Sequence, residues 1–132
     1  MNIGEISKKS GLTPKMIRRY EEKGVAPKPK RSDSGYRVYN QDDLRIFLFI
    51  HRSRSLGFSL KDTKQLISLW RNKKRASSKV KAIAISHLEK LNRKLQDIQK
   101  MTEALNNLVE SCNGGDRPDC PIIDNLSMTL SS

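Results

Sequence analysis

The spacing of apolar residues at the start of the chain predicts two short helices joined by a tight turn. Ile3 and Ile6 fall on one face of a helix, and Gly11 interrupts the pattern. Thr13 and Pro14 then form a typical helix start, with the threonine as N-cap and the proline in the first helical position. Two helices at this spacing predict a helix-turn-helix, whose second helix enters the major groove of DNA.

The predicted second helix carries a basic face. Lys15, Arg18 and Arg19 are spaced i, i+3 and i+4, so their side chains lie on one side of the helix. One interpretation is an ordinary solvated surface, and the other is a set of contacts with the phosphates of a nucleic acid. The charge of the whole N-terminal part favours the second interpretation.

The composition changes after this helix in a way that predicts a small β-hairpin. Prolines and polar residues lead into a turn at Gly35, and Tyr36 follows on the other side. Arg31 and Arg37 flank the turn. A basic hairpin beside a helix-turn-helix is typical of a wing that places Arg and Tyr side chains against backbone phosphates.

Two further helices complete the predicted DNA-binding domain, residues 1–70. Asn40 and Ser59 are their expected N-caps, and Ser59 begins a sequence that resembles a capping box. Arg52 and Arg54 offer a second set of phosphate contacts. The expected buried faces of the two helices consist of Leu44, Phe47, Leu48, Leu60, Thr63, Leu66, Ile67 and Trp70.

Residues 71–79 are polar and basic and predict a linker, whereas residues 80–111 have the pattern of a coiled coil. Apolar residues there recur at alternating spacings of 4 and 3. An alternative is that this helix folds back on its own domain, but that domain is small and offers little surface to cover it. We therefore expect a homodimer, of either helix orientation. Its seam consists of Ala84, Leu88, Leu91, Leu95, Ile98, Thr102, Leu105 and Val109.

The formal charge of +12 is concentrated in the N-terminal part. Residues 1–80 contain 20 Lys and Arg against 7 Asp and Glu, whereas residues 81–132 contain 6 against 7. A bound polyanion accounts for this asymmetry, because each neutralised phosphate releases condensed counterions. General solubility is the alternative. We expect double-stranded DNA as the partner.

The same sequence predicts a cytoplasmic protein with no membrane partner. Its N-terminus lacks the apolar run of a signal peptide, and no stretch approaches the roughly 18–20 apolar residues of a membrane span. In a reducing compartment, Cys112 and Cys120 are more consistent with metal ligands or reactive thiols than with a structural disulfide.

The segment 112–132 is expected to hold a metal-binding loop and a C-terminal tail. Glycines and a proline separate Cys112 from Cys120, and Pro121 fits the first position of a short helix with Cys120 as its N-cap. Two cysteines are too few for structural zinc, whereas soft thiolates select Cu(I) and its heavier relatives Ag(I) and Au(I). A redox disulfide and a pair of inert thiols are the alternatives.

No set of catalytic residues accompanies these features. The sequence shows no Ser/His/Asp set, no Gly-rich phosphate loop and no paired carboxylates, so we expect that the protein is not an enzyme. The competing class is a small cytosolic metal-binding or thiol redox protein with an incidental basic surface. Such a protein has no use for the excess of 20 cationic over 7 anionic residues in the first 80 positions.

Together these motifs resemble the MerR family over nearly the whole chain, and within it the CueR-like copper-efflux regulators. The resemblance implies a mostly helical fold, with a winged helix-turn-helix joined to a long antiparallel dimerisation helix. It also implies an activator that distorts promoter DNA, with RNA polymerase at the promoter, when its metal arrives. The motifs that carry it are Arg18-Arg19-Tyr20-Glu21-Glu22-Lys23-Gly24, Arg31-Ser32-Asp33-Ser34-Gly35-Tyr36-Arg37, the long helix, and Cys112 to Cys120 followed by Pro121-Ile122-Ile123.

Individual residues acquire roles from the resemblance. Cys112 and Cys120 would be linear Cu(I) ligands, and Ser77 lies where divalent-metal relatives carry a third cysteine, which argues for a monovalent ion. Arg19 replaces a common aromatic residue, and Asn113 and Pro118 lie in a variable loop, which leaves the ranking of Cu, Ag and Au open. Contacts with DNA are implied for Arg18, Tyr20, Arg31, Tyr36, Arg37 and Arg54.

Overall fold

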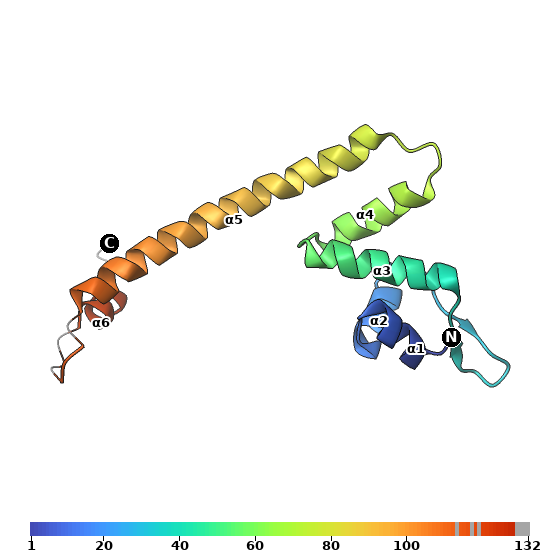
Figure 1. The fold of residues 1–132 in the computed structure, drawn as a ribbon, viewed down its shortest axis with the longest axis horizontal. Coiled ribbons are helices and arrows are strands. Elements are labelled where there is room, and N and C mark those ends of the chain that lie inside the picture. The colour runs from blue at the N-terminus through green and yellow to red at the C-terminus, as the bar shows by residue number, and fades with distance from the viewer. Residues whose placement is uncertain (113, 117, 119, 129–132) are drawn as a thin grey trace. The chain divides into compact units, whose positions relative to one another are not determined.

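The computed structural model describes residues 1–112, 114–116, 118 and 120–128. Its elements, labelled in Figure 1, are α1 (Ile3–Ser10), α2 (Pro14–Glu22), β1 (Lys30–Arg31), β2 (Arg37–Val38), α3 (Gln41–Ser55), α4 (Leu60–Arg71), α5 (Ser77–Ser111) and α6 (Pro121–Leu126). The chain divides into two compact units, Met1–Ala84 and Ile85–Ser132. The predicted fold class, mostly helical with one small hairpin and one long helix, is confirmed.

The first two helices begin and end where their capping residues predict. The Thr13 side chain accepts a hydrogen bond from the Met16 backbone N–H at 3.2 Å, and Pro14 occupies the first position of α2. Gly11 follows α1 with a φ of 78°, a left-handed conformation that glycine adopts without the steric penalty of a Cβ. The short connection between α1 and α2 is therefore the turn of the predicted helix-turn-helix.

A reciprocal capping box is present at α3 and not at α4, where the sequence predicted one. Asn40 Oδ1 accepts a hydrogen bond from the Asp43 N–H at 2.8 Å, and Asp43 Oδ2 accepts one from the Asn40 N–H at 3.0 Å. Ser59 Oγ accepts a single bond from the Asp62 N–H at 3.0 Å. Both predicted N-caps are confirmed, and of these two described helix starts only Asp43 makes the second bond of the box.

The core of the first unit forms where α1, α2 and α3 meet the base of the hairpin. Ile6, Ile17, Phe47 and Ile50 have at most 1% of their surface exposed. Burial of side chains of this size stabilises the fold by about 1.5–3 kcal/mol each. Further core residues are Leu12, Tyr20, Val25, Ala26, Tyr39 and Ile46, against which Leu44, Leu60, Ile67 and Trp70 pack from outside.

Leu48 is a correction to the predicted core, because 44% of its surface is exposed. Its spacing from Leu44 placed it on the expected buried face, and Leu44 does pack against the core. Leu48 instead lines the outer face of α3 with Arg45 and Arg52, three and four residues away along the helix. Apolar spacing alone does not show where the buried stripe of a helix ends.

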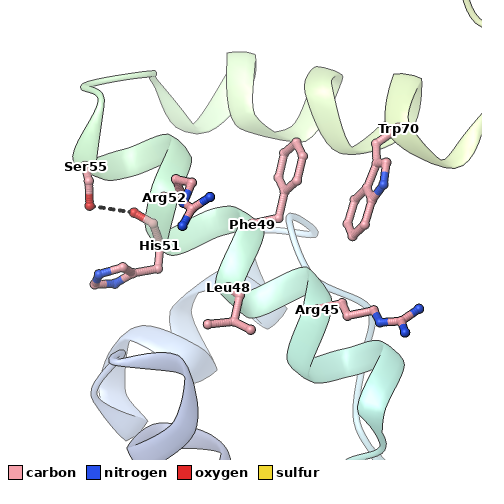
Figure 2. A pocket seen from close by; sticks show the side chains of 7 residues that line it. All are labelled: Arg45, Leu48, Phe49, His51, Arg52, Ser55 and Trp70. Atoms are coloured by element: carbon pink, nitrogen blue, oxygen red, sulfur yellow. Dashed lines mark hydrogen bonds between the residues drawn. The ribbon is translucent and has the colours of Figure 1, made fainter.

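An open hollow of about 560 Å³ lies on this outer face of α3, where α4 passes over it (Figure 2). The rings of Phe49 and Trp70 stack there, with centroids 4.7 Å apart and planes 6° apart. Trp70 is half-buried and packs on the rim of the core, so its predicted core position is only partly correct.

Thr63 of α4 is fully buried, as predicted, and its Oγ1 has no hydrogen-bond partner among the described residues. A buried hydroxyl without a partner costs about 1–3 kcal/mol. Valine has a similar shape without the hydroxyl, so we expect Thr63→Val to raise the free energy of unfolding by about 1 kcal/mol. Urea denaturation followed by the fluorescence of the single tryptophan measures this change. Thr63→Ser, which keeps the hydroxyl and loses a methyl group, should destabilise, and a destabilised valine variant would contradict the interpretation.

The long helix α5 begins at Ser77, three residues before the predicted range, and ends at Ser111 as predicted. Its large apolar side chains face solvent in the isolated chain. A row of exposed apolar residues marks a surface that a partner covers. The exposed fractions of the predicted seam are 56% at Leu88, 39% at Leu91, 53% at Leu95, 57% at Ile98 and 55% at Leu105. Among the described residues, none of the helices is long and apolar enough to cross a membrane.

Candidate nucleic-acid interface and cysteine pair

Helix α2 presents its predicted basic face to solvent. Lys15, Arg18 and Arg19 are exposed. Ile17 and Tyr20 on the opposite side are buried with 0% and 3% of their surface exposed. The apolar side therefore holds the helix against the core and directs the cationic side outwards.

A groove of about 240 Å³ lies between α2 and the hairpin. Three guanidinium groups line it, from Arg18 on α2, Arg31 on β1 and Arg37 on β2. The same three arginines line a second hollow of about 250 Å³, together with Tyr36. Arginine presents a planar fork of donors that matches phosphate oxygens, so the hollows between helix and wing suit a phosphate backbone.

The wing is held in shape by its own polar groups. Arg31 and Arg37 are directly paired across the antiparallel strands. Arg31 Nη1 donates to the Gly35 carbonyl at 2.9 Å, and the Ser32 N–H donates to the Tyr36 carbonyl at 2.8 Å. Tyr36 itself is 75% exposed at the tip. The predicted wing is confirmed, and its basic and tyrosyl side chains are available to a ligand.

Two of the predicted DNA-contacting arginines also have partners within the protein. Arg54 Nη1 donates to the Phe58 carbonyl at 2.6 Å, which ties down the turn between α3 and α4. Arg37 forms an ion pair with Glu21 of α2. Sequence analysis read Glu21 only as one letter of a motif, because nothing in the order of residues shows that it meets the wing.

Tyr20 differs from the other residues assigned to DNA. It has 3% of its surface exposed and belongs to the core. Its carbonyl accepts hydrogen bonds from the N–H groups of Val25 at 2.9 Å and Ala26 at 3.1 Å, which shapes the exit from α2. The contact with DNA that the resemblance implied for its side chain is therefore not supported by its burial.

Cys112 and Cys120 lie side by side although seven residues separate them. Their Sγ atoms are 3.5 Å apart, and both cysteines are free and half-buried. Cys120 is the N-cap of α6, as predicted, with Pro121 in the first helical position. The backbone N–H of Ile123, the Cys112 thiol and the backbone N–H of Ile122 lower the pKa of Cys120, which favours its thiolate.

The donor set around this pair is limited to sulfur. No group of three or more His, Cys, Asp and Glu side chains that could hold a metal is found in the described part of the chain. Asn113 lies outside the described residues, and Pro118 is exposed. Ser77 belongs to the other compact unit, so its assignment to the surroundings of a metal stays a prediction.

A helix-turn-helix with a basic wing, followed by a long helix with an exposed apolar seam, defines a winged DNA-binding protein. Residues 1–69 match the family described as "MerR HTH family regulatory protein", and residues 44–108 match "MerR, DNA binding". The chain belongs to the MerR family of transcriptional regulators and is not an enzyme.

Relatives match it over nearly its whole length. The chain is 52% identical to the uncharacterised HTH-type transcriptional regulator PA4778 of Pseudomonas aeruginosa, with 96% of both chains covered. It is 49% identical to heavy metal-dependent transcription regulator 2 of Rhizobium meliloti, covering 96% of this chain and 86% of the relative. It is 42% identical to the HTH-type transcriptional regulator CueR of Salmonella typhimurium, covering 96% and 92%.

A solved structure with the same arrangement is the transcription regulator PbrR691 from Ralstonia metallidurans CH34 in complex with lead(II). It has a TM-score of 0.83 and 29% sequence identity, and the match covers 96% of this chain and 99% of that one. The family and the fold expected from the sequence motifs are therefore confirmed.

The position of Arg18 in both hollows leads to a direct test of the interface. We expect Arg18→Gln to weaken binding to DNA of any sequence and to flatten the slope of log affinity against log salt by about 1, since one phosphate contact is lost. A contact with a guanine would instead cost about 1–3 kcal/mol at one base pair.

Two duplexes separate these results: one enriched by the wild-type protein from a random pool, here called the selected duplex, and one of scrambled order, called the scrambled duplex. Arg93→Gln, the same change on the exposed surface of α5, is the control. Unchanged affinity of Arg18→Gln for both duplexes would remove α2 from the interface.

Proposed function

We propose that the chain is a metal-responsive transcriptional regulator that binds promoter DNA as a homodimer and responds to Cu(I), or to Ag(I) or Au(I), through Cys112 and Cys120. The observation that carries this proposal is the cysteine pair, with its sulfur atoms 3.5 Å apart and the pKa of Cys120 lowered. Soft thiolates select Cu(I) among the common cellular metals.

The chemistry of the donor set favours a monovalent ion. Structural zinc takes four ligands, whereas the described residues supply two thiols and no cluster of further donors. Relatives respond to more than one metal by name, since they include a heavy metal-dependent regulator, CueR and a regulator in complex with lead(II). When bound, the metal would supply a cross-link between the end of α5 and the start of α6, and the two cysteines would hold it.

The exposed seam of α5 supports the homodimer. Five large apolar residues at heptad spacing face solvent, and a second copy of the same helix matches their spacing. A dimer carries two copies of α2 and of the wing, which suits two half-sites on one duplex. Promoter DNA also places RNA polymerase beside the regulator, and we include it among the partners and place the protein in the cytoplasm.

The separation of the two sites suggests how the response is transmitted. The predicted DNA contacts precede Lys79 and the metal loop follows Val109, with α5 between them. A metal shifts an equilibrium only by its difference in affinity for the two states. Deforming DNA costs a few kcal/mol, which altered contacts can offset. We therefore expect the metal-free and metal-bound dimers both to occupy the operator, with activation coming from a change in DNA shape.

Footprinting and transcription run together with and without Cu(I) test this proposal. The expected result is a footprint in both conditions, altered reactivity in its centre and increased transcription with Cu(I). Release of the protein from DNA by Cu(I) would replace the distortion mechanism by simple derepression. No binding to duplex DNA would leave the metal-binding or thiol redox protein as the remaining function.

Ser77 offers a test of selectivity between monovalent and divalent ions. If Ser77 lies near the metal in the dimer, Ser77→Cys adds a third thiolate, and we expect Zn(II) or Hg(II) then to induce transcription. The matched control is Ser78→Cys, one position along α5. The reporter response to each ion measures the change, and the same ion specificity in both variants would place Ser77 away from the site.

A further inference from the structure

A carboxylate lies among the cations of the proposed DNA-binding groove. Glu21 lines the groove with Arg18, Arg31 and Arg37. Its side chain is 4% exposed, although it belongs to a helix whose other charged groups point into solvent. A negative charge near a phosphate backbone opposes binding, so a role for Glu21 inside the protein has to be found in its contacts.

Those contacts reach from the helix to the wing. Arg37 Nη1 on β2 donates to Glu21 Oε1 on α2, and the two groups form an ion pair. The Tyr39 hydroxyl, just beyond β2, donates to Glu21 Oε2 at 3.1 Å, and Arg37 Nη1 lies 3.4 Å from the Tyr39 oxygen. The hydrogen bond with Tyr39 and the charge of Glu21 raise the pKa of Arg37, against the effect of partial desolvation. The three side chains therefore form one closed hydrogen-bonded set.

Tyr39 fixes this set to the rest of the domain. Its ring packs edge-to-face on Phe47 of α3, with centroids 5.9 Å apart and planes at 71°. Its N–H donates to the Met1 carbonyl at 2.7 Å, and the Met1 amino group donates to the Tyr39 carbonyl at 2.8 Å. Tyr39 is 3% exposed, and its burial is the main cause that raises its pKa and keeps the hydroxyl protonated as a donor. The base of the wing is therefore tied to the core.

From this geometry we infer that Glu21 is a positioning residue that sets the wing, through Arg37 and Tyr39, at a fixed place relative to α2, and thereby determines how well the protein distinguishes its operator from other DNA. The inference rests on the proposed DNA-binding surface. An operator is recognised when α2 and the wing fit the same stretch of duplex together, whereas non-specific binding needs only cations near phosphates. A loose wing weakens the first kind of binding more than the second.

Electrostatics alone makes the opposite prediction, which is what makes the inference testable. Removing a negative charge from a DNA-binding surface reduces repulsion and strengthens binding to every duplex. Removing a group that positions the wing weakens binding to the operator and lowers the ratio of affinities for the selected and scrambled duplexes. The two effects of one substitution therefore have opposite signs on the selected duplex.

The test is Glu21→Gln, which keeps the shape of the side chain and removes its charge. We expect affinity for the selected duplex to fall about tenfold, comparable to the loss of one hydrogen bond to a charged group, with no loss on the scrambled duplex. Glu22→Gln is the matched control, because it removes the same charge one position along α2 from an exposed carboxylate. It should bind both duplexes slightly more tightly. A Glu21→Gln variant that behaves like Glu22→Gln, or that keeps the wild-type affinity ratio, overturns the inference.

Two further variants show whether Glu21 acts through its partners. Tyr39→Phe keeps the ring on Phe47 and removes only the hydroxyl, and we expect an affinity ratio about fivefold lower. This variant carries the test if Glu21→Gln does not fold. In the Arg37→Gln background, Glu21→Gln should lower the ratio no further, because the interaction is already broken. Additive losses would mean that Glu21 does not act through Arg37.

Arg18→Gln in the same assay separates this inference from the proposed function. If Arg18→Gln weakens binding while Glu21→Gln leaves the affinity ratio unchanged, the DNA surface stands and the role of Glu21 is wrong. If the wild-type protein does not distinguish the two duplexes, both are wrong.

Discussion

Replacing both Leu91 and Leu95 by aspartate should leave the protein mostly monomeric at micromolar concentration. In a homodimer the two substitutions place four carboxylates in one apolar seam, and burying unpaired charges costs several kcal/mol. The remaining seam residues do not offset this cost, since a fully buried leucine contributes only about 1.5–3 kcal/mol. Sedimentation velocity measures the loss of the dimer directly.

The same variant should bind the selected duplex about a hundredfold more weakly or worse, because two linked binding units gain a factor of about 10² to 10⁴ over one. The control is Gln96→Asp with Lys100→Asp, which introduces two aspartates at the same spacing on the other side of α5. An intact dimer in the Leu91 and Leu95 variant would show that the heptad residues do not form the interface.

Replacing Cys112 by serine should abolish the response to Cu(I) while leaving DNA binding intact. The hydroxyl is a hard oxygen donor and Cu(I) prefers soft sulfur, so one of two ligands is lost. Changes outside the ligand shell already cost about 10–100-fold in metal affinity, and loss of a ligand should exceed the upper value. A Cu(I) titration against a competing chelator measures the affinity, and transcription measures the response.

Cys120→Ser should give the same result, because the two thiols are 3.5 Å apart and no third donor cluster is found in the described residues. Ser111→Ala, next to Cys112 in the chain, should keep the wild-type affinity for Cu(I). Affinity for the selected duplex should stay within about twofold in all three variants, since the substitutions lie far along the chain from the predicted phosphate contacts. Normal Cu(I) induction in Cys112→Ser would remove this residue from the sensor.

The local elements of the first unit follow from local rules. Thr13, Asn40 and Ser59 accept hydrogen bonds from the third residue of the helix that each begins, and a glycine near position 11 can adopt a positive φ. These interactions join residues at most a few positions apart, so the order of the sequence contains them. The heptad spacing of α5 is local in the same sense, since it depends only on the geometry of one helix.

Contacts between distant residues were not predictable in this way. The Glu21 carboxylate meets Arg37 sixteen residues later, and its partner Tyr39 is held by Met1 and Phe47. The burial of Tyr20 and the exposure of Leu48 likewise depend on which face of each helix packs against its neighbours. A hydrophobic pattern shows that a helix has two faces and leaves the edge of the buried face undefined.

The sequence by itself therefore determined the helices, their caps, the wing, the basic face of α2 and the two cysteines as the chemically distinctive pair, because each depends on neighbouring residues or on residue type. Only the tertiary structure decided which charged groups face the ligand and which hold the protein together. Arg18 faces the groove freely, whereas Arg37 is shared with Glu21 and Tyr20 is part of the core. The physical reason is that a side chain's charge is a property of the residue, whereas its exposure and its partners depend on how distant segments pack.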